Sequence, residues 1–374
     1  MADGQNGGLD PRPTVVVVGG GYGGVTVAKA LDETADVVLV EEKDAFMHNV
    51  AAHRALVDTA WLPRIFLPYS KLLTNGRIVH DRVVEAEPSR IVTASGEEIT
   101  ADYLVLATGS RYPFPAKTDL VDTQRSIEQI QATHDALERA DRVLLVGAGP
   151  VGIELAGEIR QVWPDKTITL FDPQVDVLRG PFFPELRAEL RRQLADLGVE
   201  TVLGSPLTAD PSTEPGQLGA VTVTTESGVE LSADIWFRCY GVTPNSQYLG
   251  EVLATARRAD GFVEVAPTLQ VVGQRNVFAF GDLSTADAKM AGAARRQAAV
   301  VAANITALAS GGDLVDYQPM GPAIAIPLGT EGGAGQFPGQ DGIVGSEVIA
   351  NAKGRDMMVQ PFAELFGLAV AAAE

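Results

Sequence analysis

Two parts of the chain show the same order of apolar and polar positions. The first opens with an unbroken apolar run over 14–18, which is typical of a strand buried on both faces of a parallel sheet. A glycine-rich turn over 19–24 follows, and then a helix is predicted over 25–31 and a second strand over 37–40. This order of strand, turn, helix and strand predicts a parallel βαβ unit.

The same unit recurs in the middle of the chain. Its strands are predicted over 142–146 and 167–171, its turn over 147–152 and its helix over 153–160. A repeated βαβ unit predicts an α/β fold with two doubly wound, Rossmann-like domains.

Three further segments extend this pattern. Apolar strands are predicted over 103–106, before the small-residue turn 107–110, and over 276–280, before Gly281 and Asp282. A helix that packs one face into a core is predicted from the spacing of four leucines, at positions 186, 190, 194 and 197.

Both turns carry glycines with the spacing GxGxxG. They are Gly19, Gly21 and Gly24 in the first unit and Gly147, Gly149 and Gly152 in the second. The first glycine allows a tight turn, the second lets the backbone approach a pyrophosphate, and the third permits close packing of helix on strand. The pyrophosphate then lies at a helix N-terminus, where free N–H groups favour negative charge. A plain β-turn-α connection explains either motif alone, so it is the ordered context that favours a dinucleotide site.

An acidic residue ends the strand that follows each turn. Glu41 lies 22 residues after Gly19, and Asp172 lies 25 residues after Gly147, where a carboxylate accepts hydrogen bonds from ribose hydroxyls. Asp172 would also repel a 2′-phosphate, which predicts a preference for NADH over NADPH, and Arg179 is close enough in sequence to soften it. Two dinucleotide sites in one chain indicate two nucleotides that exchange electrons, commonly a flavin and a nicotinamide.

The composition excludes several other functions. The 29 Lys and Arg stand against 48 Asp and Glu, and the net charge of −19 disfavours nucleic acid and anionic lipid as partners. Cys239 is the only cysteine, so an intrachain disulfide and a CxxC redox centre are excluded, and we expect it to be a small core residue. The four histidines show no metal-ligand spacing, so no metal is expected.

The N-terminal residues are not expected to form a secretory signal or a myristoylation site. About the first dozen residues are polar and rich in Gly and Pro, so we expect them to be disordered, and Ala2 offers no glycine for myristoylation. No window approaches the ~20 apolar residues that span a bilayer, so we expect a cytoplasmic protein whose sequence does not support peripheral membrane contact. The apolar tail 361–374 is expected to pack on its own domain or a second subunit, against the alternative that it guides a hydrophobic acceptor. An oligomer is compatible with the sequence.

These motifs together resemble the flavoprotein family of pyridine-nucleotide oxidoreductases with two dinucleotide-binding domains. Within it, the chain is similar to the ferroptosis suppressor protein or apoptosis-inducing-factor-like branch, which is related to type II NADH:quinone dehydrogenases. The resemblance runs from about residue 15 to about residue 359. It is carried by the segments 46–52, 69–70, 107–110 with 113–115, 289–291 and 353–356.

The resemblance implies FAD in the first unit, with Glu41 at the adenosine ribose. Gly109 and Asp282 would close over the ribityl-phosphate side of the flavin, although Asp282 taken alone is better explained as the N-cap of a helix beginning near Ser284. Arg54 is expected close to FAD.

The resemblance also implies which residues surround the reacting rings. Lys289 and Met290 match residues beside the isoalloxazine ring, and Gln297 matches a residue on its quinone side. The second unit would hold NAD(P)H, with Glu154 near the nicotinamide; its alternative is a helix N-terminal carboxylate favoured by the dipole. The catalytic candidates are therefore Glu154, Lys289 and Gln297.

The sequence departs from the branch at several positions. Its mammalian members carry His where this chain has Gln297 and Asp172, and Cys where it has Leu283. They also begin with a myristoylation glycine, which is absent here.

The predicted architecture is an FAD-binding domain in two pieces, 12–115 and 255–318, with an NAD(P)H-binding domain inserted at 116–254. Gly241 marks the return crossing and is expected to be a cofactor-binding residue. Residues 319–374 would form a small α+β C-terminal module with a flexible turn over 329–335.

The resemblance predicts an enzyme that passes hydride from NADH or NADPH to FAD and then two electrons to a quinone or other small acceptor. Two alternatives stay open: a reductase of an electron-carrier protein, and a slow-turnover NADH-sensing protein like apoptosis-inducing factor.

Overall fold

The computed structural model describes residues 12–368, which form two compact units. Unit 1 contains residues 12–43, 69–110 and 244–319, and unit 2 contains residues 44–68, 111–243 and 320–368. The residues expected to be disordered at the N-terminus lie largely outside the described part. No helix within residues 12–368 is long and apolar enough to cross a membrane.

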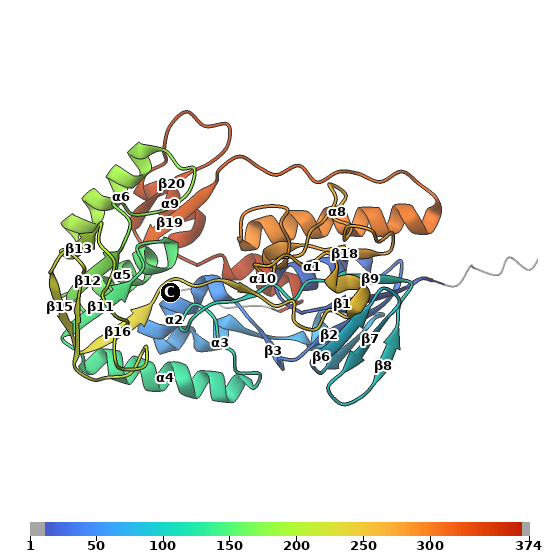
Figure 1. Ribbon diagram of the computed structural model, residues 1–374, viewed down its shortest axis with the longest axis horizontal. Helices are drawn as coiled ribbons and strands as arrows, with labels where there is room; N and C mark the ends of the chain where they lie inside the picture. Colours follow the sequence, from blue (N-terminus) through green and yellow to red (C-terminus); the bar gives the residue numbers. More distant parts are fainter. Residues whose placement is uncertain (1–11, 369–374) are drawn as a thin grey trace, which may run out of the picture. The chain divides into compact units, whose positions relative to one another are not determined.

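Unit 1 is built on a parallel five-stranded sheet in the order β18-β9-β1-β2-β5 (Figure 1). Its strands are β1 (Thr14–Val18), β2 (Asp36–Glu41), β5 (Arg77–His80), β9 (Tyr103–Leu106) and β18 (Val277–Ala279). The residues of β1 after Thr14 are at most 2% exposed, because the strand lies in the middle of the sheet with both faces covered. Helices α1 (Tyr22–Leu31) and α8 (Ala291–Ser310) pack against each other.

Smaller elements complete unit 1. They are the antiparallel sheet β6 (Val83–Glu87), β7 (Arg90–Thr93) and β8 (Glu98–Thr100), the helix α7 (Glu251–Ala254), and the short turns η3 (Tyr69–Lys71) and η4 (Gly281–Leu283). Two short strands, β10 (Ser110–Arg111) and β17 (Thr243–Pro244), lie where the chain passes from one unit to the other.

Unit 2 is built on a second parallel sheet, in the order β13-β12-β11-β16. Its strands are β11 (Arg142–Val146), β12 (Thr167–Asp172), β13 (Val199–Leu203) and β16 (Ile235–Arg238). Its longer helices are α4 (Thr123–Arg139), α5 (Pro150–Val162) and α6 (Pro184–Asp196), and the hairpin of β14 (Val221–Thr224) and β15 (Glu230–Ala233) packs beside β11. The two parallel sheets confirm the predicted α/β fold.

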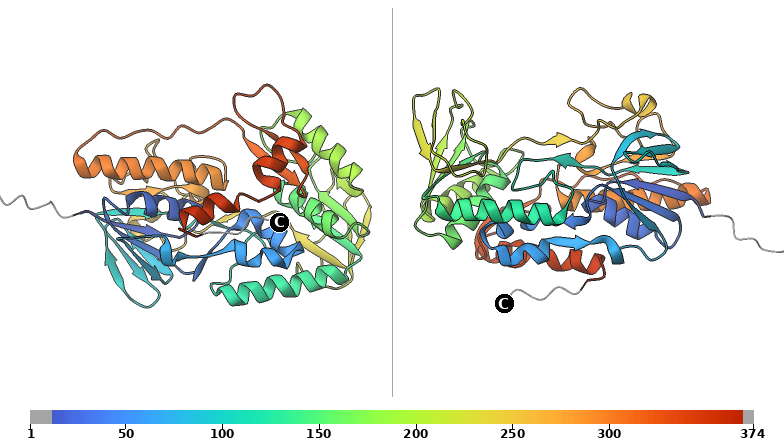
Figure 2. Two further views of the ribbon diagram at one scale, coloured as in Figure 1. Left: turned by 180° about the vertical axis from the view of Figure 1, so that it is seen from behind. Right: turned by 90° about the horizontal axis from the view of Figure 1, so that it is seen from below.

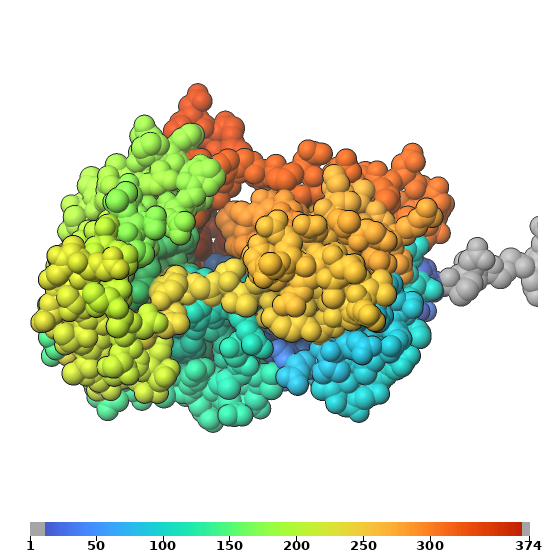
Figure 3. All heavy atoms as spheres, viewed as in Figure 1, coloured from blue at the N-terminus to red at the C-terminus, as the bar shows by residue number. Residues whose placement is uncertain are grey.

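Two segments far apart in sequence complete unit 2. The first contains β3 (Ala45–Met47), η1 (Asn49–Ala51), α2 (Ala52–Val57), η2 (Thr59–Trp61), α3 (Leu62–Ile65) and β4 (Phe66–Pro68). The second contains β19 (Ile324–Leu328), β20 (Gly332–Gln336), α9 (Ser346–Ile349), the π-helix η5 (Ala350–Gly354) and α10 (Val359–Leu365). The hairpin of β19 and β20 packs on α5 and α6, as the red and green segments show from behind (Figure 2). With all heavy atoms drawn as spheres, red and green segments of unit 2 again lie side by side (Figure 3).

Three details differ from the sequence expectations. The prediction of a helix beginning near Ser284 is wrong. Helix α8 begins at Ala291, with Met290 as its N-cap, and Asp282 lies in η4. The flexible turn expected over 329–335 is wrong in its second half, which is strand β20. This strand is rich in glycine because a Cβ at Gly333 would lie 2.3 Å from the Ile326 carbonyl oxygen of the paired strand. The leucine helix exists, with Leu186, Leu190 and Leu194 at 0% exposure, but it ends at Asp196, just before Leu197.

The division of the chain by cofactor stays a prediction, because the two units are defined by compactness alone. Within unit 2, the C-terminal residues 361–368 are packed rather than extended. Phe362 and Phe366 are at most 2% exposed, and both rings contact Phe46. This is the packed arrangement favoured by the sequence; the rest of the tail, 369–374, lies outside the described residues.

We expect Phe362→Ala to lower the free energy of unfolding by about 3–5 kcal/mol, because it leaves a cavity beside Phe46 and His48. Urea denaturation measures the change. Gln360→Ala, at an exposed position of the same helix, is the matched control and should change the free energy by less than about 0.5 kcal/mol. Equal effects of the two substitutions would show that α10 does not contribute to the core.

Candidate functional site

The two glycine-rich turns are built alike. The N–H of Gly19 donates to the carbonyl of Val40 (2.8 Å), and that of Gly147 donates to the carbonyl of Phe171 (2.7 Å). Both glycines have φ in the left-handed region, +99° and +119°, which residues with a Cβ rarely adopt. Each turn is therefore fastened to the end of the strand that follows it.

The third glycine of each turn allows the start of the helix to lie close to the first glycine of that turn. A Cβ at Gly24 would lie 1.8 Å from the Gly19 carbonyl oxygen, and a Cβ at Gly152 would lie 2.0 Å from the Gly147 carbonyl oxygen. No side chain fits at either position, so the helix begins directly against the strand end.

The middle glycine of each turn faces open space. Gly21 and Gly149 are the N-caps of α1 and α5, and no other described residue comes within 4 Å of the place where a Cβ would lie. The free N–H groups of the first helical turn point to this side, which is where a helix binds phosphate. Both turns therefore fit a pyrophosphate group.

An acid bridges each turn to the end of the next strand. Glu41 accepts hydrogen bonds from the backbone N–H of Gly20 and Lys43. Asp172 accepts from the N–H of Ala148 (2.8 Å) and Gln174 (2.9 Å) in the same pattern. Burial raises the pKa of Glu41, while the two N–H donors act in the opposite direction. The remaining lone pairs of each carboxylate suit ribose hydroxyls.

In unit 1 the η4 turn is held from two sides. Asp282 accepts a hydrogen bond from the Ser110 hydroxyl (2.7 Å), so it does not act as the N-cap of a helix. The N–H of Gly281 donates to Oε1 of Gln297 (2.6 Å), a side chain of α8 that is 1% exposed. Gln297 therefore positions the turn that carries Asp282, and its role beside the flavin stays a prediction.

A second turn of unit 1 carries Gly109, whose φ is +62°. The Thr108 hydroxyl donates to the Asn245 carbonyl (2.7 Å), and the Asn245 side-chain amide donates to the Thr108 carbonyl (2.9 Å). The N–H of Asn245 also donates to the Gly109 carbonyl (3.0 Å). Asn245 thus fixes the Gly109 turn, a role that the sequence did not suggest.

Lys289 holds its own loop in this structure. Its ammonium group donates to the carbonyls of Ser284 and Asp287, and it lies 4.7 Å from the centre of the Phe262 ring. Burial lowers the pKa of Lys289. Met290 follows at the N-cap of α8.

In unit 2 two acids on one face of α5 form ion pairs, of which that of Glu158 is buried and that of Glu154 is partly buried. Glu154 accepts from Nζ of Lys353 (2.6 Å), and Glu158 accepts from Nε and Nη2 of Arg54. Nη2 of Arg54 also donates to the carbonyl of Gly354 (2.9 Å). Burial raises the pKa of both glutamates, while the paired cations oppose that rise. Arg54, expected close to FAD, is here bound to α5 and to the C-terminal segment.

The sequence missed the partners in this cluster. Lys353 lies 199 residues from Glu154, and only its place in a segment that carries the family resemblance singled it out. Nε2 of His48, in the other such segment, lies 2.8 Å from the carbonyl oxygen of Met357. The structure therefore brings the segments 46–52 and 353–356 into one place.

The family model of the pyridine nucleotide-disulphide oxidoreductases matches residues 13–303. The chain belongs to this family. Its members use FAD and take electrons from NAD(P)H, so this protein is an FAD-dependent oxidoreductase with NAD(P)H as its electron donor. In this member the single Cys239 leaves no pair of thiols to form a redox disulfide.

Relatives of known name cover almost the whole chain. Ferroptosis suppressor protein 1 of Taeniopygia guttata is 33% identical over 357 residues, covering 94% of this chain and 95% of the relative. The human protein of that name is 32% identical, with coverages of 92% and 93%. Apoptosis-inducing factor homolog B of Dictyostelium discoideum is 32% identical, with coverages of 87% and 90%.

Solved structures share the fold at lower identity. The sulfide:quinone oxidoreductase of Aquifex aeolicus has a TM-score of 0.73 and 17% identity, with 94% of this chain and 90% of that chain covered. A complex of putidaredoxin reductase with putidaredoxin gives a TM-score of 0.70 and 21% identity, with coverages of 87% and 81%.

One histidine of this enzyme is buried without a partner. His53 is 4% exposed, and neither ring nitrogen has a hydrogen-bond partner in the described part of the chain. Burial and the charge of Lys353 lower its pKa to about 3. The folded state therefore keeps this imidazole neutral well below the pH at which the unfolded chain protonates it.

We expect His53→Leu to reduce the acid sensitivity of the fold. Since the folded pKa lies below the unfolded value of 6.5, stability falls as the pH decreases from about 6.5 towards 3. Protonation of His53 in the unfolded chain lowers the free energy of unfolding by about 2 kcal/mol between pH 7 and pH 5. The leucine variant should not show this loss. Denaturant titrations at the two pH values measure it, with the exposed His80→Gln as the matched control. If the pH dependence of stability were unchanged in His53→Leu, His53 would not be the source of the acid sensitivity.

Proposed function

We propose that this enzyme is an NADH-preferring quinone oxidoreductase. The observation that carries the proposal is the combination of two open pyrophosphate cradles with a single buried cysteine. Two nucleotides suit hydride transfer within the protein, and without a dithiol the electrons must pass from the flavin directly to an external acceptor. The likeness to the ferroptosis suppressor proteins and to a sulfide:quinone oxidoreductase supports a quinone as that acceptor.

In this proposal the first turn belongs to FAD. Gly21 gives the pyrophosphate its approach, Glu41 takes the ribose hydroxyls, and Gly109 and Asp282 lie on the ribityl-phosphate side. Lys289, Met290 and Gln297 are the residues that would surround the isoalloxazine ring. When bound, FAD accepts hydride from NAD(P)H and delivers two electrons to the acceptor.

The second turn belongs to NAD(P)H. Gly149 admits the pyrophosphate and Asp172 takes the ribose hydroxyls. Glu154, on the second turn of α5, lies where the nicotinamide half would reach, and its carboxylate accepts a hydrogen bond from Nζ of Lys353. The proposed division by cofactor is 12–115 and 255–318 for FAD, 116–254 for NAD(P)H and 319–374 for the C-terminal module, with Gly241 at the return crossing.

A carrier-protein reductase is the weaker candidate. Its support is the fold shared with putidaredoxin reductase, whereas a net charge of −19 opposes an acidic electron carrier.

We expect NADH oxidation to be fast with a water-soluble quinone and slow with oxygen alone or with a ferredoxin-like protein. Steady-state absorbance of NADH measures all three with the same flavin-loaded enzyme. Turnover with the carrier protein above that with the quinone would favour the second candidate. Slow turnover with every acceptor would favour a sensing role.

The assignment of the turns predicts opposite effects of two substitutions. We expect Gly21→Val to purify without flavin, because a side chain would occupy the approach of the pyrophosphate. Gly149→Val should keep the flavin but lose NADH binding. The flavin-to-protein absorbance ratio and NADH fluorescence titration measure the two outcomes. Gly345→Val is the matched control, since it is an N-cap glycine equally free of close neighbours. Full flavin occupancy in Gly21→Val would contradict the assignment.

We expect Asp172→Asn to shift the ratio of kcat/KM for NADPH over NADH upwards by about tenfold, or about 1.4 kcal/mol. The amide keeps an oxygen that can accept from Ala148, but it removes the charge that repels a 2′-phosphate. Initial rates with both nucleotides measure the ratio. An unchanged ratio would mean that another residue decides the preference.

A further inference from the structure

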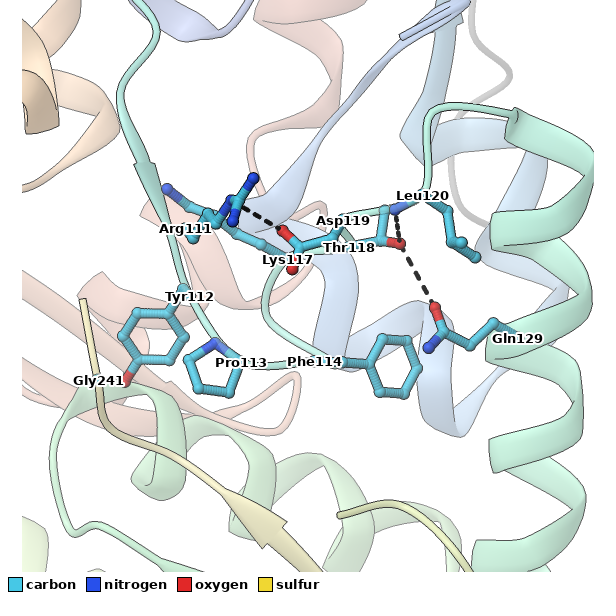
Figure 4. Close-up of a pocket in the computed structure, with 10 residues that line it drawn as sticks. All are labelled: Arg111, Tyr112, Pro113, Phe114, Lys117, Thr118, Asp119, Leu120, Gln129 and Gly241. Carbon is cyan, nitrogen blue, oxygen red and sulfur yellow. Dashed lines mark hydrogen bonds and ion pairs between the residues drawn. The ribbon is translucent and has the colours of Figure 1, made fainter. Parts of the chain in front are cut away.

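Unit 2 contains a pocket of about 350 Å³ that neither proposed nucleotide turn lines (Figure 4). Its wall is the segment 111–120, and Gln129 of α4 and Gly241 close its two sides. The volume lies within the range of small-molecule sites.

The lining combines an apolar wall with a cationic rim. Tyr112, Pro113, Phe114 and Leu120 supply two aromatic rings and two apolar side chains, as the sticks show (Figure 4). The charged residues of the lining are Arg111, Lys117 and Asp119. The pocket thus suits a molecule with a flat apolar body and a carboxylate that the Arg111 guanidinium can bind.

The Arg111 guanidinium can be recruited by such a ligand. Its ion pair with Asp119 is long, at 3.8 Å, and the two side chains are 68% and 74% exposed. Exposed pairs of this kind contribute little free energy. A carboxylate, which matches the planar fork of the guanidinium in two parallel hydrogen bonds, competes well with Asp119.

The pocket wall is connected to the second glycine turn through Cys239. The Tyr112 hydroxyl donates to the Cys239 carbonyl (2.6 Å), and the N–H of Cys239 donates to Val146 at the end of β11 (2.8 Å). The same Cys239 carbonyl oxygen lies 2.8 Å from the place of a Cβ at Gly147, so it packs directly on the turn. A displacement of the Tyr112 side chain would therefore be transmitted to Gly147 through the carbonyl group of Cys239.

We propose that this pocket is an effector site for a small planar aromatic carboxylate, and that its occupation alters NAD(P)H affinity through Tyr112 and Cys239. The ring lies against Tyr112 and Phe114, and the carboxylate binds Arg111. A polyanion such as a nucleotide is disfavoured, because Asp119 in the same lining would repel it. The coupling to NAD(P)H rests on the proposed function, which assigns the second turn to NAD(P)H. The binding of a carboxylate in the pocket does not rest on it.

The binding test uses the flavin-loaded enzyme and benzoate as the probe, in calorimetric titration. We expect benzoate to bind, and its neutral isostere benzamide and the non-planar cyclohexanecarboxylate to bind at least about tenfold more weakly. Arg111→Gln should weaken benzoate by about tenfold, whereas Arg125→Gln, an exposed arginine of α4 outside the pocket, should not. Equal binding of the three probes, or equal effects of the two arginine variants, would overturn the site.

The coupling test measures the Kd of NADH by fluorescence with and without saturating benzoate. We expect a change of several-fold, and the same factor in the Kd of benzoate with and without NADH, since coupling is reciprocal. Tyr112→Phe should keep benzoate binding and abolish the change, because it removes only the hydroxyl bonded to Cys239. Benzoate binding with an unchanged NADH Kd in the parent enzyme would overturn the coupling. NADH binding that survives Gly149→Val would instead refute the nucleotide assignment and leave the benzoate site standing.

Discussion

In each unit a helix begins directly against a strand end, and the rest of the site depends on this close approach. The carbonyl oxygens of Gly19 and Gly147 lie where a Cβ on Gly24 or Gly152 would collide. Because the helix starts there, its free N–H groups face the open side of the turn. The next strand must then end beside the turn, and the acid at its tip reaches back to bond the backbone. One steric constraint thus fixes together the open helix N-terminus and the acid at the tip of the next strand.

Buried charge is the second organising constraint, and it acts in unit 2. A buried ion must be paired, and removing one partner of a buried pair costs about 3–5 kcal/mol. Glu158 is 1% exposed, and Arg54, which pairs with it, also holds the carbonyl of Gly354. Gly354 is the residue after Lys353, so this pair positions the lysine that bonds Glu154. The same contacts explain why the C-terminal segment packs on α5.

Local patterns predicted what local physics decides. The apolar runs and glycine spacings predicted the central strands of both sheets and both turns, because strand burial and tight turns are read within a few residues. The pairing of Glu154 with Lys353 was not accessible, since nothing within either segment indicates the other. The glycines of β20 suggested flexibility, yet Gly333 is required by the close approach of the Ile326 carbonyl, which only the paired strand reveals. Asp282 resembled a helix N-cap because its actual partner, Ser110, is 172 residues away.

The family is named for disulphide chemistry, but this member has only one cysteine and cannot form a redox disulfide within its chain. Cys239 is 2% exposed, and burial raises the pKa of its thiol to about 12, so it stays protonated at neutral pH. Its backbone serves the fold instead, since the N–H extends the bonding of β11 and the carbonyl holds Tyr112 and abuts Gly147. A protonated, enclosed thiol without a second cysteine cannot relay electrons. In this member of the family, electrons therefore cannot pass to the acceptor through a protein disulfide.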